Sequence, residues 1–204
     1  MTKEELTTKL ERDGILKTPE IKKALLRIDR RDFVPKDLIN LAYEDIPLPI
    51  GDGQTISQPG TVAFMLELLQ PQEGDKILEV GAGSGWVTAL LAQIVGESGF
   101  IYSYEINRKV AGFGLENLGK TSLKNYRYTL GDAKQSWSKD APYTKIIAGA
   151  AFPFVFKELY SLIENGGIIV IPTQSFDIKR IRKSFGTGAV TQESYYGFVF
   201  VPLK

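Results

Sequence analysis

Three acidic residues stand at the ends of apolar runs, where a side chain can serve chemistry rather than packing. Glu79 lies two residues before a glycine-rich turn, Glu105 follows the second run, and Asp132 follows the third together with Gly131. In α/β sheets, ligands bind outside the carboxyl ends of the parallel strands. We therefore expect these three carboxylates to face one ligand from a single edge of a sheet.

The turn after Glu79 reads Gly81-Ala82-Gly83-Ser84-Gly85 and runs into an apolar helix. Glycines let the backbone turn sharply and approach a ligand closely, and the N–H groups at the start of the helix face that ligand. A dinucleotide site needs G-x-G-x-x-G, but Trp86 occupies the last position of that pattern. A carboxylate at Glu79 also opposes a pyrophosphate. A ligand with a cationic head group, such as S-adenosylmethionine, fits better.

Each carboxylate then has a candidate role in binding this cofactor. We expect Glu79 to face the cationic end, Glu105 to accept from both ribose hydroxyls, and Asp132 to accept from the adenine amino group. Each feature also has a structural alternative: a tight turn for the glycines, a helix cap for Glu105, and an Asx-turn for Asp132. Their occurrence at three consecutive strand ends favours a cofactor site, and hence a methyltransferase.

The composition excludes several other kinds of chemistry. Among 204 residues there is no His and no Cys, which rules out a Ser-His-Asp triad, a thiol nucleophile and a His- or Cys-ligated zinc site. We expect no metal. The net charge of +1 gives no general attraction to nucleic acid or membrane, and no apolar leader follows Met1. We expect a monomeric, cytoplasmic protein.

The order of predicted elements indicates one domain over residues 1–204, with a helical extension at 1–45 and an extended, proline-containing segment at 46–60. Thr2 and Glu5 form a capping-box pattern at the first helix. Residues 61–204 then alternate between strands and helices, which is typical of a parallel sheet with helices on both faces. Strands are expected at 77–80, 100–104, 125–130, 144–149 and 168–171, helices at 60–69, 85–95, 107–118 and 154–163, and a final antiparallel hairpin at 178–183 and 195–201.

A set of motifs between about residue 31 and the C-terminus resembles the protein-L-isoaspartate O-methyltransferase family. The resemblance implies a Rossmann-like, class I S-adenosylmethionine-dependent α/β methyltransferase that methylates isoaspartyl residues in damaged proteins and peptides. It also implies that Gln54, Thr55, Ile56, Ser57 and Pro59 bind the acceptor, with Ser57 in the catalytic role. The motifs are Leu41-Ala42-Tyr43-Glu44-Asp45, Leu48-Pro49-Ile50-Gly51, Gly53-Gln54-Thr55-Ile56-Ser57-Gln58-Pro59, Leu78-Glu79-Val80-Gly81, Ala141-Pro142-Tyr143, Asn165-Gly166-Gly167 and Phe200-Val201-Pro202-Leu203.

The implied reaction suits a chain without imidazole. A carboxylate acceptor is already ionised at pH 7 and needs no general base. The nucleophile is an anion and the methyl donor a cation, so excluding water and fixing an in-line geometry should supply much of the acceleration. We expect Ser57 to orient the acceptor carboxylate by donating a hydrogen bond. Its alternative is helix capping, for which Gln58, before Pro59, is better placed.

Several positions depart from the family pattern and leave other functions open. Within residues 46–60, which we call the acceptor segment, Asp52 and Gly60 border the Gly53–Pro59 motif. Thr144 and Gly149 lie on the fourth strand, where we expect them near the cofactor, and Gly112 and Gly114 interrupt a helix. A normal Asp in a dedicated partner peptide is therefore an alternative acceptor, and a cofactor-binding protein without turnover is another. The basic run Lys179–Lys183 suggests nucleic acid, but a charged edge strand explains it better.

Overall fold

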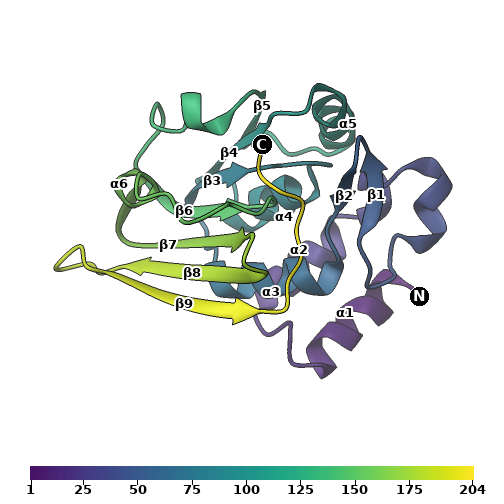
Figure 1. Cartoon of the computed structure of the whole chain (residues 1–204). Coiled ribbons are helices and arrows are strands. Elements are labelled where there is room, and N and C mark those ends of the chain that lie inside the picture. The colour runs from purple at the N-terminus through teal and green to yellow at the C-terminus, as the bar shows by residue number, and fades with distance from the viewer.

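The computed structural model describes all residues from Met1 to Lys204 and is built around one seven-stranded sheet (Figure 1). The strand order is β5-β4-β3-β6-β7-β8-β9; the first five strands in this order run parallel, and β8 pairs antiparallel with both β7 and β9. The chain moves outward in one direction after β3 and in the other after β6. The carboxyl ends of these two neighbours are therefore the switch point where α/β proteins bind ligands. The strands are β3 (Lys76–Val80), β4 (Phe100–Glu105), β5 (Tyr126–Leu130), β6 (Tyr143–Ala148), β7 (Ile163–Thr173), β8 (Asp177–Lys183) and β9 (Val190–Tyr196).

Helices cover the sheet unequally. One face carries three long helices, with two more packed outside them, and forms the larger apolar core. The second face is covered by a short helix, a 3-10 turn and the loops around them, which enclose a smaller core. The larger layer consists of α3 (Pro59–Leu69), α4 (Trp86–Val95) and α5 (Arg108–Gly119), with α1 (Lys3–Arg12) and α2 (Pro19–Arg27) outside them. The smaller layer consists of η3 (Ala133–Gln135) and α6 (Leu159–Leu162).

The N-terminal extension is helical, as the sequence predicts, and is fastened to the main layer. The Thr2 hydroxyl and the Glu5 carboxylate form the predicted capping box of α1. The Glu67 carboxylate of α3 accepts from the backbone N–H of Lys17 and Thr18 at the start of α2. Two 3-10 segments, η1 (Arg30–Phe33) and η2 (Lys36–Leu41), then lead to the acceptor segment.

Residues 46–60 are more ordered than a loop. β1 (Leu48–Gly51) and β2 (Gln54–Ile56) pair as an antiparallel hairpin outside the main sheet, with Asp52 at its tip. Figure 1 shows this hairpin beside α5, across from the carboxyl ends of the central strands. The prolines exclude these residues from the main sheet, but a two-stranded ribbon needs few ladder bonds.

Three predicted elements differ in extent. The strand predicted at 168–171 extends over the whole of β7. The helix predicted at 154–163 shrinks to α6, because residues 154–158 form bends and turns ahead of it and Ile163 already belongs to β7. The last strand is β9 rather than 195–201, because Gly197 adopts a φ of 95° and ends the strand. The chain beyond Gly197 turns back along the carboxyl ends of the central strands, where Val201 bonds to Ala151 (Figure 1).

None of the helices combines the length and the hydropathy needed to cross a bilayer.

Candidate functional site

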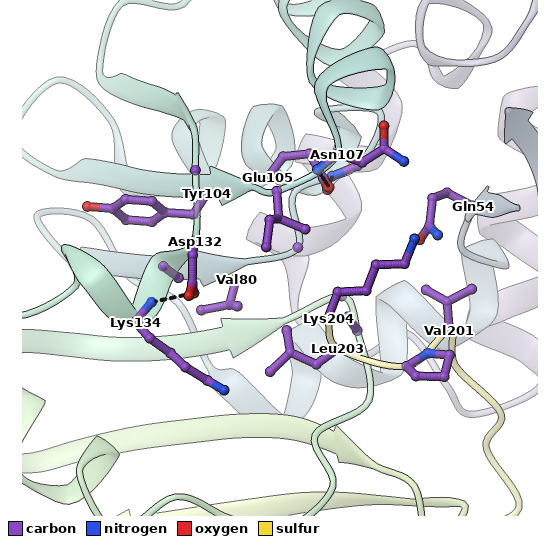
Figure 2. A pocket seen from close by; sticks show the side chains of 18 of the residues that line it. Gln54, Val80, Tyr104, Glu105, Asn107, Asp132, Lys134, Val201, Leu203 and Lys204 are labelled. Carbon is purple, nitrogen blue, oxygen red and sulfur yellow. Dashed lines mark hydrogen bonds between the residues drawn. The ribbon is translucent and has the colours of Figure 1, made fainter. Parts of the chain in front are cut away.

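Two adjoining cavities open at the carboxyl ends of β3, β4 and β6. Their empty volumes, which include space open to solvent, are about 700 and 540 Å³. Figure 2 shows the first cavity, with Asp132 and Lys134 on one side and Gln54 with Lys204 on the other. The first is lined by residues that include Gln54, Thr55, Gly81, Gly83, Glu105, Gly131, Asp132 and Trp137, and the second by residues that include Thr55, Ile56, Ser57, Glu79, Gly81, Gly83, Ser84 and Trp86.

Glu79 is 2% exposed and lines the second cavity. The hydroxyls of Thr88 and Ser103 both donate to its Oε2, at 2.5 and 2.6 Å. Burial raises the pKa of Glu79 to about 7; the two hydroxyls oppose this shift, and the nearby Glu105 charge adds to it. A cation entering the second cavity would favour the ionised form of this carboxylate.

Glu105 is the last residue of β4, and its carboxylate binds the backbone of the glycine turn. Its Oε2 accepts from the Gly83 N–H at 3.0 Å and its Oε1 from the Asn107 N–H at 2.9 Å. A carboxylate offers about four acceptor positions. The remaining positions are available to hydroxyl donors in the first cavity, as the predicted ribose contact requires.

Asp132 caps a 3-10 turn and also lines the first cavity. Its Oδ1 accepts from the Lys134 N–H at 2.9 Å and so caps η3, which is the Asx-type geometry expected as the structural alternative (Figure 2). The same residue lines the first cavity beside Gly131 and Ala133. Capping therefore fixes the carboxylate where the adenine amino group is expected.

The glycine turn is held by side chains that the sequence did not single out. Tyr128 donates its hydroxyl to the Gly83 carbonyl at 2.8 Å, and burial raises the Tyr128 pKa, which keeps this donor protonated. Asn117 donates to the Ser84 carbonyl at 3.2 Å. A Cβ on Gly114 would lie 2.5 Å from the Gly83 oxygen. A side chain therefore does not fit where α5 packs against the turn.

Gly85 ends the glycine turn and lines neither cavity. It is the N-cap of α4 with a φ of 82°, and an added Cβ would lie 2.8 Å from the Leu118 side chain. Pro59, predicted to contact the acceptor, also lies outside the cavity walls, as the buried first residue of α3. Both residues shape the site without facing a ligand.

A groove continues from the second cavity toward the surface, and Ser57 lines both. The groove wall contains hydroxyls, the Gln58 amide and apolar residues of 197–201, but no charged side chain. Thr55 and Gly149 line both cavities and the groove. The three compartments therefore meet at one point, between the β1–β2 hairpin and the end of β6.

Ser57 does not cap the helix that follows it. Gln58 is the N-cap of α3, as predicted, and makes no side-chain bond there. The capping acceptor comes from elsewhere: Asp45 Oδ1 accepts from the Gly60 N–H at 2.7 Å. A Cβ on Gly60 would lie 3.0 Å from this carboxylate, which accounts for the glycine. The Ser57 hydroxyl makes no hydrogen bond within the protein and is available to a ligand in the groove.

The other departures from the family pattern have separate structural roles. Asp52 binds Asn107 and Lys109 at 2.9 and 3.2 Å, which ties the hairpin tip to the start of α5. Thr144 was expected near the cofactor, but it lies at the opposite end of β6, where its hydroxyl bonds to both backbone groups of Lys76. Gly149 does belong to the site, and an added Cβ would lie 2.5 Å from the Gly81 oxygen.

Comparison with known proteins agrees with this arrangement. The family model "Protein-L-isoaspartate(D-aspartate) O-methyltransferase (PCMT)" matches residues 1–204. The protein-L-isoaspartate O-methyltransferase of Aeropyrum pernix is 40% identical over 201 residues, covering 97% of this chain and 77% of the relative.

Two solved structures have the same fold. One, a protein-L-isoaspartate O-methyltransferase, aligns with a TM-score of 0.89 at 25% identity and covers 100% of this chain and 66% of its own. The other, a Plasmodium falciparum chain described as PCMT in complex with S-adenosyl-L-homocysteine, aligns with a TM-score of 0.86 at 22% identity, covering 98% and 97%. The match of the family model to residues 1–204, together with the 40% identical relative, shows that this chain belongs to the protein-L-isoaspartate(D-aspartate) O-methyltransferase family.

Proposed function

We propose that this enzyme transfers the methyl group of S-adenosylmethionine to the free α-carboxylate of L-isoaspartyl residues in damaged proteins and peptides, which starts their repair. The observation that carries the proposal is the junction at Thr55 and Gly149. Two cavities suited to the donor and one groove suited to the acceptor meet there. Family membership supplies the identity of the acceptor.

The cofactor is divided between the two cavities in this proposal. The adenosine occupies the first cavity, with the ribose hydroxyls at Glu105 and the adenine amino group at Asp132. The methionine part occupies the second, with its ammonium at Glu79 and its carboxylate near Ser84 and the start of α4. Gly81 and Gly83, which line both cavities, let the ligand pass closely between them. The P. falciparum structure of the same fold holds S-adenosyl-L-homocysteine.

The acceptor enters through the groove. When bound, S-adenosylmethionine supplies an electrophilic methyl group on a positively charged sulfur. Ser57 donates a hydrogen bond to one oxygen of the acceptor carboxylate and leaves the other free to attack. Thr55, at the junction, helps to align that oxygen with the methyl group. No cation lines the groove, so no ion pair stabilises the acceptor carboxylate before it reacts.

Both halves of the site come from one chain, and we expect the enzyme to act as a monomer. Its partners are isoaspartyl-containing proteins and peptides, and we expect the enzyme to be cytoplasmic. The two cavities contain the acidic residues that bind the cofactor, and the basic residues of β8 lie outside them. No group of His, Cys, Asp or Glu side chains in the structure could hold a metal ion.

A product analysis tests this function. Incubation with methyl-labelled S-adenosylmethionine and an isoaspartyl peptide should give one labelled ester per isoaspartyl residue, followed by loss of methanol and closure to the succinimide. Label on a normal aspartyl peptide alone would support the alternative of a dedicated partner. Binding of S-adenosyl-L-homocysteine without labelling of any peptide would indicate a protein that has lost turnover.

A further inference from the structure

Arg30 is a buried cation outside both cavities, and the mechanism above gives it no part. It belongs to η1 in the N-terminal extension and is only 2% exposed. A buried charge usually has a carboxylate partner. Arg30 has none within ion-pair distance; the Asp45 charge acts on it from farther away. Its guanidinium instead binds three backbone carbonyls.

Two of these carbonyls lie near the two ends of the acceptor segment, and the third, that of Ala42, lies just before it. Nη2 donates to the Ile46 carbonyl at 3.2 Å and to the Ser57 carbonyl at 3.0 Å, and Nη1 donates to the Ala42 carbonyl at 2.6 Å. Ile46 precedes the β1–β2 hairpin and Ser57 follows it. One nitrogen therefore bridges the base of the hairpin, while the other fixes the plane of the guanidinium on Ala42. A flexible ammonium has no such second point of attachment.

The same guanidinium also contacts the element that follows the glycine turn. Its central carbon lies 5.2 Å from the centre of the Trp86 ring. Trp86 is the first residue of α4, directly after Gly85, and lines the second cavity. Arg30 therefore joins the backbone of Ser57 to the helix that begins at the cofactor turn.

We propose that Arg30 is a positioning residue for methyl transfer: it fixes the Ser57 backbone relative to the glycine turn, so that the Ser57 hydroxyl meets the acceptor carboxylate in line with the methyl group. The proposal rests on the function proposed above. It goes beyond that function by assigning a role to the N-terminal extension, whose buried arginine orders the acceptor segment without touching either ligand.

Three variants test this role in the full chain. Arg30→Met removes the donors and keeps most of the volume, Arg30→Lys keeps the charge without the planar fork, and Arg27→Met makes the same charge change on the exposed side of α2 as a control. We expect Arg30→Met to lower kcat/KM for an isoaspartyl peptide by about a hundredfold, since a small misplacement of reacting groups has effects of that size. Arg30→Lys should lower it by about tenfold because one ammonium cannot reproduce the bonds that the two guanidinium nitrogens make to Ala42, Ile46 and Ser57.

Binding of S-adenosyl-L-homocysteine separates positioning from general damage. Calorimetry should give each Arg30 variant a Kd within about threefold of the Arg27→Met value, because Arg30 bonds to no group of the glycine turn. Hydrogen exchange of the complex should be faster in residues 46–58 and unchanged in β3 and α4. A fall in peptide activity matched by an equal loss of cofactor affinity would overturn the proposal.

Arg30→Lys decides the question if Arg30→Met fails to fold. Native kcat/KM together with native exchange in residues 46–58 of this variant would contradict the role of the fork. The exchange measurement needs no acceptor. If the unmodified enzyme methylates no isoaspartyl peptide, the proposed function fails, while exchange in the bound complex still shows whether Arg30 orders the acceptor segment.

Discussion

Glu79 and Ser57 show how two polar side chains at the same site serve different ends. Glu79 is buried, and two hydroxyls occupy the same oxygen of its carboxylate. Ser57 is half-buried, with its carbonyl fixed by Arg30 and its hydroxyl without a protein partner. At the residue scale, one group is prepared to receive a cation, and the other to donate to an anion.

The raised pKa of Glu79 predicts that cofactor binding releases a proton. Because this pKa is about 7 in the free protein, the carboxyl is mostly protonated at pH 6, and a bound ammonium should ionise it. Calorimetry of S-adenosyl-L-homocysteine in buffers of different ionisation enthalpy should detect up to one released proton, and binding should strengthen between pH 6 and 8, by up to about tenfold for each pH unit below the pKa.

Glu79→Gln should abolish this proton release, whereas the exposed Glu97→Gln should retain it. The same group also affects stability. Its folded pKa lies above the ordinary value of 4.5, so its stabilising contribution is complete below about pH 4.5 and is lost as the pH rises through about 7. Proton release that persists in Glu79→Gln would assign the titration to another group.

Removing the Ser57 hydroxyl should affect catalysis and spare cofactor binding. Ser57→Ala is expected to reduce kcat by about 10- to 100-fold, the range for loss of one orienting donor, with an unchanged Kd for S-adenosyl-L-homocysteine. Steady-state kinetics with an isoaspartyl peptide provides the measurement, and Ser98→Ala, an exposed serine ahead of β4, is the matched control. Full activity in Ser57→Ala would remove the role assigned to this hydroxyl.

Among the elements, α5 contains two glycines in its interior, and contact with the cofactor turn explains one of them. Gly114 touches the cofactor turn at the Gly83 carbonyl and Tyr128, whereas a Cβ on Gly112 would meet nothing within 4 Å. Both glycines lie inside α5, two residues apart. A side chain is therefore excluded at Gly114 by its neighbours and allowed at Gly112.

The two alanine variants should shift stability in opposite directions. Gly112→Ala should raise the free energy of unfolding by about 1 kcal/mol, from helix propensity alone. Gly114→Ala should lower it by about 1–3 kcal/mol, the usual size of overpacking, and should weaken S-adenosyl-L-homocysteine binding because the glycine turn must shift. Urea unfolding of both variants gives the comparison. A stabilised Gly114→Ala would mean that α5 does not press on the turn.

The acidic residues at the strand ends were predictable from the sequence. The residues that hold the site in place through distant hydrogen bonds were not. Glu79, Glu105 and Asp132 follow apolar runs directly, so local pattern and sheet topology place them together. Arg30, Tyr128 and Asn117 act on carbonyls of distant segments, and no local pattern indicates such partners. The β1–β2 hairpin was predicted only as an extended segment, since Pro47 and Pro49 argue against a paired strand.

Across the whole molecule, the sheet provides the edge where we propose that the cofactor binds, and the proposed acceptor groove combines N-terminal segments with residues 197–201. The central strands end at the two cavities, while the hairpin, α3 and the segment after β9 form the groove. The N-terminal helices hold this acceptor side in place through Arg30 and Glu67. Selectivity for the acceptor therefore depends on parts of the chain that are remote in sequence.

In the proposed function, this groove delivers an isoaspartyl carboxylate to the methyl donor. The most direct measurement compares kcat/KM, with S-adenosylmethionine in excess, for two peptides of one sequence that contain either L-isoaspartate or normal L-aspartate. We predict that the isoaspartyl peptide is favoured by about a hundredfold or more, because only its α-carboxylate reaches the junction in line. Equal values for the two peptides, or a preference for the aspartyl form, would contradict the account.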